Sequence, residues 1–404
     1  MAHIQADEQT RNELIDEVGI SLQACVGAEG LAYPLQVILA SARRESGDDP
    51  TTATYRQSSE TIMPPESWSL YTLMLRSRLF EEAVAGLWRD GLISGEMHLG
   101  TGEEAVIAGV VSQVRDGDAM ALDHRGTAAL LMRGVDPVLI VRELLGRPDG
   151  LCGGAGGHVH LFSREHLAAS SGIVGAAGPT AAGFALAAQY LHPGSIAVAF
   201  FGDGAMNQGM LMEAMNLAAA WSLPVLFVCK DDGWAITTRS EGMTGGDLNA
   251  RARGLGVPAV EVDGLDASAV WEASRAAIAR ARSGLGPTFL HARCVHDEGH
   301  FLGFQLIRIV RDPLREMPGV AVPLTRSFVH PGGAALRERL EGLRGVLAAV
   351  LSTLRDPRRD PVNDPVRRAR MALQTDPARL QELEDQADRE IGHVFATALA
   401  DVAS

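Results

Sequence analysis

Two acidic residues of this chain follow two successive apolar runs. Asp203 lies in a glycine turn after the strand-like run 195–201, and Asp232 follows a second strand-like run, 223–229, with the helix-like run 210–221 between them. A lone Gly-Asp-Gly is a common turn, but this order of strand, acidic turn, helix and strand is typical of a site for a divalent cation and a diphosphate. Tight glycine turns and helix N-termini favour phosphate, and Mg²⁺ takes a few carboxylates plus phosphate oxygens.

Alternating strands and helices must hold these residues in place. Strand-like and helix-like runs alternate from about residue 68 to about residue 295, which predicts an α/β fold with a doubly wound, mostly parallel sheet. Such open sheets bind ligands at the carboxyl ends of their strands, where both acidic residues stand. The other expected elements are a helix at 71–90, a helix that ends near residue 114, a helix at 267–283, and strands at 260–264 and 287–291.

The run 202–237 resembles the thiamine diphosphate motif, in which Gly-Asp-Gly is followed further along the chain by an Asn pair. Over residues 68–313, several motifs in the right order are similar to those of the alpha subunit of the 2-oxo acid dehydrogenase first component, in its pyruvate and acetoin dehydrogenase branches. The resemblance implies the thiamine diphosphate-binding fold, with thiamine diphosphate and Mg²⁺ as cofactors.

By this resemblance the metal ligands are Asp203, Asp232 and the backbone carbonyl of Trp234. The family has Asn at 231 and 232, whereas this chain has Asp at both positions. Asp232 offers an oxygen at similar reach, but its extra charge repels the diphosphate, and we expect Lys230 to offset part of it. The turn residues assigned to the diphosphate are Gly202, Gly204 and Ala205. The alternative is a degenerate site that binds no cofactor.

The segment Asp123-His124-Arg125-Gly126 follows the apolar run 119–122. It resembles a family segment whose arginine contacts the diphosphate. Arg125 suits this role because a guanidinium can pair with phosphate oxygens in a bidentate way, and His124 beside it is a further candidate for cofactor binding. The later histidines of the family segment are replaced here by Thr-Ala-Ala, which puts the usual substrates of the family in question.

A glycine-rich run at 153–157 leads to His158 and His160. It resembles a family loop whose catalytic histidine corresponds to His160. A nicotinamide-binding fingerprint is the rival interpretation, but no strand leads directly into the run and no helix clearly follows it. In the next matching segment, Gly172 and Val174 correspond to residues whose backbone groups hold the aminopyrimidine ring. Backbone contact explains why small residues suffice there.

His98 and His300 match family histidines near the reacting centre, the second of them on a mobile loop over the active site. Each could act as acid, base or charge stabiliser. The plain alternative for either is a structural imidazole with satisfied hydrogen bonds. The family loop continues to an Asp-Pro pair, whereas this chain has Phe-Leu-Gly-Phe-Gln at 301–305, which again indicates an altered substrate or acceptor.

The resemblance also implies a partner chain. Activation of the cofactor needs a Glu against its pyrimidine nitrogen, and in this family that Glu comes from the beta subunit. We divide this chain into a helical N-terminal extension (1–66), a diphosphate-binding α/β domain (67–313) and a helical C-terminal region (314–404) with a Pro- and charge-rich linker. The last region is too short for a second α/β domain. We therefore expect a heterotetramer of two alpha and two beta chains, inactive without the beta subunit.

Composition excludes several classes of function. The formal net charge of −14 over 404 residues argues against nucleic-acid binding. No uncharged apolar run reaches membrane-spanning length, and the charged N-terminus does not fit a signal peptide. The cysteines are widely spaced without a CxxC pair, which favours reduced thiols and a cytoplasmic location. They are Cys25, Cys152, Cys229 and Cys294.

Three functions are compatible with these observations. The first is cleavage of the C–C bond beside the carbonyl of a 2-oxo acid or acetoin, with the acyl unit passed to a lipoyl arm or another carrier domain. The second is a transketolase-like transfer of a two-carbon ketol unit from a sugar phosphate to a carrier protein in a biosynthetic pathway. The third is a noncatalytic scaffold subunit, against which the spacing of Asp203, Asp232 and Arg125 argues.

Overall fold

The computed structural model describes residues 67–296 except 237, residues 299–300, residues 360–400 and a few helical positions between 337 and 344. It also describes two short strands, β1 (Val26–Gly27) and β2 (Gly30–Leu31), which pair antiparallel in a separate unit, Met1–Met63. The rest of the predicted N-terminal extension and the loop 301–305 lie outside the described residues. No helix within the described residues has both the length and the apolar character needed to cross a membrane.

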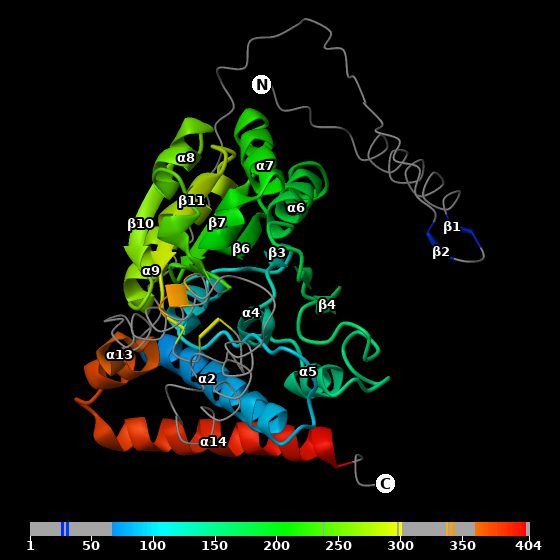
Figure 1. Cartoon of the computed structure of the whole chain (residues 1–404), viewed down its shortest axis with the longest axis vertical. Coiled ribbons are helices and arrows are strands. Elements are labelled where there is room, and N and C mark those ends of the chain that lie inside the picture. The colour runs from blue at the N-terminus through cyan, green and yellow to red at the C-terminus, as the bar shows by residue number, and fades with distance from the viewer. Residues whose placement is uncertain are drawn as a thin grey trace, which may run out of the picture. The chain divides into compact units, whose positions relative to one another are not determined.

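A parallel sheet forms the centre of the second unit (Figure 1). Within the described residues it has 7 strands in the order β10-β11-β7-β6-β3-β5-β4, and every neighbouring pair is parallel except β4 with β5. The strands are β3 (Ala119–Leu122), β4 (Phe162–Ser163), β5 (Ala168–Ser170), β6 (Ala197–Gly202), β7 (Val225–Asp231), β10 (Ala259–Asp263) and β11 (Thr288–Arg293). Parallel neighbours need crossover connections, which the intervening helices supply.

Helices cover both faces of this sheet. Phe200 of β6 belongs to the apolar cluster that includes α3 and α9, whereas Phe201 belongs to the cluster with α6, α7 and α8. Successive strand residues point to opposite faces, so a strand covered on both sides is a continuous apolar run. The predicted doubly wound, mostly parallel α/β fold is therefore confirmed. The helices are α2 (Ser67–Arg89), α3 (Glu104–Val111), α4 (Thr127–Arg133), α5 (Pro137–Leu144), α6 (Ala177–Leu191), α7 (Gly209–Ala220), α8 (Leu248–Gly254) and α9 (Ala267–Arg282).

The order in which successive strands are added to the sheet reverses between the neighbouring strands β3 and β6. The strand β5 lies on one side of β3, and the next strand of the chain, β6, lies on the other. Open α/β sheets bind ligands outside the carboxyl ends of their strands at such a switch point. Arg125 lies shortly after β3 and Asp203 directly after β6, so the topology places these two candidates on either side of the switch point.

Two further helices, α13 (Pro365–Ala372) and α14 (Pro377–Leu399), pack against α2. Tyr71 of α2 donates a hydrogen bond to Glu384 Oε1 at 2.8 Å, and the rings of Phe80 and Phe395 have their centroids 5.2 Å apart. Figure 1 shows α14 lying across α2. Residues of α14 thus share an apolar core with the α/β domain, while the predicted boundary between 313 and 314 stays a prediction.

Candidate active site

Asp203 directly follows strand β6, with its side chain turned into the protein. A 3-10 turn, Asp203–Asn207, leads from β6 to α7, and Asp203 is only 1% exposed. Its Oδ2 accepts a hydrogen bond from the hydroxyl of Ser240, whereas Oδ1 is buried without a hydrogen-bond partner among the described residues. A Cβ on Gly204 would lie 3.0 Å from Cβ of Ala235, so a glycine lets the turn pack this closely. An unpartnered buried acceptor is costly unless a ligand supplies a partner.

Two more carboxylates lie at the end of the neighbouring strand, β7. Asp231 Oδ2 contacts His291 Nε2 at 2.7 Å, and Asp232 Oδ2 contacts His296 Nδ1 at 2.7 Å. The backbone N–H of Trp234 donates to Asp232 Oδ1 at 3.3 Å. Because β6 and β7 are parallel neighbours, these side chains stand at the same edge of the sheet as Asp203.

The charges of these carboxylates fit a divalent cation. Burial, and after it the charges of Asp232 and Asp231, raises the pKa of Asp203 to about 8. Burial also acts to raise the pKa of Asp232, but the charge of His296 outweighs it and lowers that pKa. A bound cation relieves repulsion among buried carboxylates, and Mg²⁺ prefers oxygen ligands. The unpartnered oxygen of Asp203 is therefore suitably placed to meet a magnesium ion.

Arg125 joins three segments around the switch point. Its Nε donates to the carbonyl oxygen of Leu99 at 2.9 Å, its Nη2 donates to the carbonyl oxygen of His300 at 2.6 Å, and its Nη1 lies 2.9 Å from His124 Nε2. The side chain is buried and forms no ion pair with the described residues. A buried guanidinium held in this way is a ready partner for an anion such as a diphosphate.

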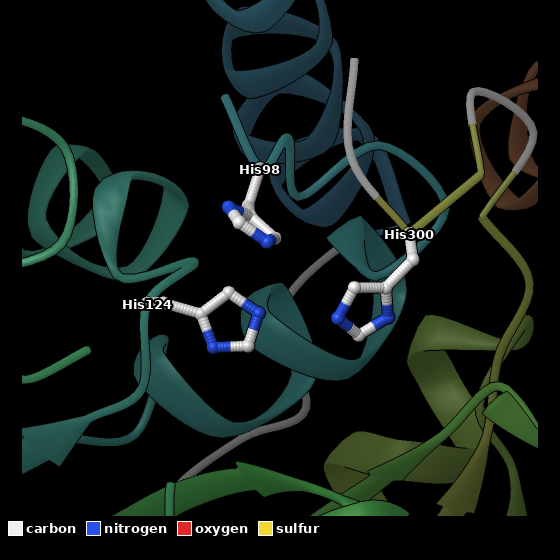
Figure 2. Close-up of side chains that lie close together, drawn as sticks. All are labelled: His98, His124 and His300. Carbon is white, nitrogen blue, oxygen red and sulfur yellow. The ribbon is translucent and has the colours of Figure 1, made fainter. Parts of the chain in front are cut away.

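Three imidazole rings face one another beside this arginine. One ring nitrogen from each of His98, His124 and His300 lies within 4.8 Å of the others (Figure 2). His158 joins them, since its Nε2 lies 3.1 Å from His98 Nδ1. The structure therefore brings the predicted residues His98 and His300 together, although they are far apart in the sequence.

These imidazoles are neutral near neutral pH. Burial first, and the Arg125 guanidinium second, lowers the pKa of His98 and of His300 to about 3 and that of His158 to about 4. The pKa of His124 is lowered for the same two reasons. A positive charge beside neutral rings disfavours a further cation, so the cluster is better suited to an anionic group or to the oxygen of a polarised carbonyl.

Glu143 anchors the glycine-rich loop. This buried carboxylate accepts three hydrogen bonds from backbone N–H groups, those of Cys152 at 2.7 Å, Gly154 at 2.8 Å and Gly156 at 2.7 Å. The loop consists of turns, as expected for a run that is not a nicotinamide fingerprint. Glu143 therefore sets the position of the segment that carries His158 into the imidazole cluster.

His160 comes to lie beside the predicted aminopyrimidine segment. A Cβ on Gly172 would lie 3.7 Å from His160 Nε2 and 3.1 Å from Cβ of Val159. Val174, in the same segment, is 47% exposed. The segment around His160 thus packs against Gly172, while the roles predicted for His160, Gly172 and Val174 stay predictions.

A buried chain of charged groups links the two sides of the site. His296 Nε2 lies 2.8 Å from Glu103 Oε1, and Lys230 Nζ donates to Glu103 Oε2 at 2.6 Å and to Asp123 Oδ1 at 3.1 Å. The expectation that the charge of Lys230 offsets part of the charge of Asp232 stays a prediction. The side chain of Lys230 pairs with Glu103 and Asp123, and the side chain of Asp232 contacts His296.

The sequence analysis assigned no role to the residues that keep the predicted site residues in position. Four such residues contact predicted site residues or the loops that carry them, namely Glu103, Glu143, Ser240 and His296. A weak signal existed for the first, because two adjacent glutamates inside an otherwise apolar helix start need partners. For His296 the only signal in the sequence is that it lies close to His300, which was predicted as a site residue.

Comparison with known proteins identifies the family. A family model described as Dehydrogenase E1 component matches residues 71–303. The chain belongs to this family. The match spans the whole parallel sheet, from α2 to the loop that carries His300. The family predicted from the sequence is thereby confirmed, and with it an enzyme family that implies thiamine diphosphate as cofactor.

Three relatives each match more than half of the chain. The alpha subunit of the acetoin:2,6-dichlorophenolindophenol oxidoreductase of Cupriavidus necator is 41% identical over 237 residues, which are 58% of this chain and 71% of the relative. The same subunit from Bacillus subtilis is 40% identical over 236 residues, with coverages of 58% and 71%. The pyruvate dehydrogenase E1 component subunit alpha of Zymomonas mobilis is 40% identical over 240 residues, with coverages of 58% and 67%.

Proposed function

We propose that this chain is the alpha subunit of an enzyme that cleaves the C–C bond beside a carbonyl of acetoin or of a 2-oxo acid. It uses thiamine diphosphate with Mg²⁺ and passes the acyl unit to a lipoyl arm or another carrier domain. The names of the relatives, which refer to acetoin oxidation and to pyruvate dehydrogenase, support this choice of substrates. We expect a cytoplasmic enzyme.

The observation that carries the proposal is the buried, unpartnered oxygen of Asp203 beside Asp232, across the switch point from Arg125. Asp203 and Asp232 would hold the cation, with the backbone carbonyl of Trp234, and Arg125 would bind the diphosphate. The backbone of the turn at Gly202, Gly204 and Ala205 would complete the diphosphate site.

The imidazole cluster would handle the substrate oxygen. Thiamine diphosphate supplies the electron sink for the bond that breaks. His98 and His300 are neutral, so each can donate an N–H hydrogen bond to a carbonyl oxygen or accept a proton from a hydroxyl. His300 Nδ1 is buried without a partner among the described residues, which makes it a candidate for this contact. A negative charge that develops nearby would raise the imidazole pKa and favour proton uptake.

A beta-type chain completes the site in this proposal, because the family supplies the Glu at the pyrimidine nitrogen from that subunit. Ile173 is 61% exposed and Val174 47% exposed in the segment assigned to the pyrimidine. Apolar side chains at such a surface suit burial by a partner. We expect two alpha and two beta chains in the assembly.

Cofactor binding tests the proposal. Thiamine diphosphate with Mg²⁺ is titrated calorimetrically into the chain co-purified with its beta-type partner, and we expect saturable binding that Asp203→Asn abolishes. Absence of saturable binding in the unmodified complex would refute the proposal.

Substrate trials then identify the reaction. Acetoin, pyruvate and a ketose phosphate are each offered with an artificial electron acceptor or a carrier domain. Turnover of the ketose phosphate alone would replace acyl transfer by ketol transfer. Full turnover by the purified single chain would contradict the need for a beta subunit.

A further inference from the structure

His296 is held between two carboxylates in the interior of the protein. Its Nδ1 lies 2.7 Å from Asp232 Oδ2, and its Nε2 lies 2.8 Å from Glu103 Oε1. The side chains of His296, Asp232 and Glu103 are 3%, 8% and 2% exposed. Glu103 is held in turn by Lys230 at 2.6 Å. Little water reaches these groups, so their charges act on one another and on the cation site with weak screening.

The geometry sets the charge of His296. Both ring nitrogens face carboxylate oxygens, and an ionised carboxylate only accepts hydrogen bonds. Both nitrogens therefore carry a proton, and the ring is positively charged.

His291 provides the contrast, at the end of the same sheet. Its Nε2 faces Asp231 Oδ2 at 2.7 Å, but its Nδ1 faces the Nδ2 of Asn249 at 3.1 Å. The same Nδ2 lies 3.1 Å from Glu261 Oε2, so it is the donating amide nitrogen. His291 Nδ1 must therefore accept, and the ring carries one proton and no charge. Of two histidines that each hold an aspartate of the Asp231-Asp232 pair, only His296 brings a positive charge.

We propose that His296 is the positioning residue that allows an aspartate, Asp232, to serve as a cation ligand next to a diphosphate. The proposal rests on the function proposed above. His296 binds Oδ2 of Asp232, fixes the direction of the carboxylate and cancels the charge by which aspartate differs from a neutral amide ligand. Glu103 and Lys230 hold the imidazole ring from its other side.

The proposal predicts effects of opposite sign on two ligands. Without the charge of His296 the site is more negative, which favours a lone divalent cation and disfavours a polyanionic diphosphate. A variant that merely disturbs the local structure weakens both ligands. The two affinities therefore separate a role in charge from a role in packing.

Binding of Mn²⁺ and of inorganic diphosphate to the chain co-purified with its beta-type partner tests this. Mn²⁺ is followed by electron paramagnetic resonance, and diphosphate by calorimetry at saturating Mn²⁺. In His296→Gln we expect Mn²⁺ alone to bind at least as tightly as in the unmodified chain, and diphosphate to bind roughly tenfold to a hundredfold more weakly. In the double variant Asp232→Asn with His296→Gln, which is neutral at both positions, we expect diphosphate affinity to return to within about threefold of the original. The matched control is His291→Gln, which removes an imidazole of the same kind but no charge.

Each outcome decides between the two proposals. Absence of saturable Mn²⁺ and diphosphate binding in the unmodified complex overturns the proposed function. Normal binding there, together with unchanged diphosphate affinity in His296→Gln, overturns only the role of His296. An equal loss of diphosphate affinity in the double variant or in the His291→Gln control also overturns the role of His296. Circular dichroism of each variant shows that it is folded, and if His296→Gln is not, the folded double variant still tests whether a neutral pair restores binding.

Discussion

Glu81 makes the stability of this protein depend on pH in an unusual direction. The side chain lies on α2, is 3% exposed, and its Oε1 has no hydrogen-bond partner among the described residues. Burial, and next the charge of Glu104, raises the pKa of Glu81 from 4.5 to about 8. The folded protein therefore keeps a proton that the unfolded chain releases at mildly acidic pH.

The magnitude follows from proton linkage. A raised carboxyl pKa contributes stability that is fully present below the unfolded value of 4.5 and is lost as the pH rises to the folded value of about 8. Within this window each pH unit costs about 1.4 kcal/mol, so the free energy of unfolding falls by roughly 3 kcal/mol between pH 4.5 and neutral pH. The variant Glu81→Gln has no proton to lose. Near neutral pH we expect its free energy of unfolding to exceed that of the unmodified chain by about that amount. Near pH 4.5 we expect no difference between the two.

Urea denaturation at several pH values between 4.5 and 8 measures this difference. The relevant quantity is the gap between the two unfolding midpoints, which we expect to widen steadily as the pH rises. Glu213→Gln, at an exposed position of α7, is the control and should follow the unmodified chain at every pH. Parallel curves for Glu81→Gln and the unmodified chain would refute the assignment of a buried, protonated Glu81.

Three further perturbations are open to measurement. Lys230→Met leaves two buried carboxylates without their cation, and we expect urea denaturation to show a loss of about 3–5 kcal/mol, with Lys230→Arg as the milder control. Asp203→Asn should abolish diphosphate-linked Mn²⁺ binding in calorimetry. It should also raise the unfolding temperature of the ligand-free chain at neutral pH, because the amide needs no proton, whereas the folded Asp203 carboxyl, with its pKa raised to about 8, must take one up. A fall in that temperature would contradict the reasoning. Glu143→Gln offers one acceptor oxygen to three loop N–H groups. Amide hydrogen exchange over residues 152–156 should therefore accelerate by about tenfold or more. Unchanged exchange would show that the loop does not depend on this carboxylate.

Local sequence patterns predicted the elements well. The strand-like runs 195–201 and 223–229 correspond to β6 (Ala197–Gly202) and β7 (Val225–Asp231), and the helix expected at 71–90 corresponds to α2 (Ser67–Arg89). Each observed strand extends slightly further toward its carboxyl end than its apolar run. Parallel pairing continues there, with Gly202 opposite Lys230, so hydrogen bonding to the neighbour rather than hydrophobicity sets the last residues.

The contacts of Lys230 could not be read from the sequence. Side chains alternate along a strand, so residues two apart point to the same face. Val228, two residues earlier, packs with α3 and α9, so Lys230 points to the same face and meets Glu103 at the start of α3. The carboxylate that meets Lys230 there belongs to another element packed on that face, so the run around Lys230 does not name it.

The sequence by itself determined the family, the order of the elements and the candidate ligands, because hydrophobic runs, glycine turns and the residue types that follow each strand are local properties of the chain. Only the tertiary structure decided which groups hold those ligands. His296 meets Glu103 across 193 positions, and Lys230 meets Glu103 across 127. Contacts of this range depend on how the strands are ordered and twisted into one sheet. The charge carried by each buried histidine depends in turn on those partners, so no local pattern can reveal it.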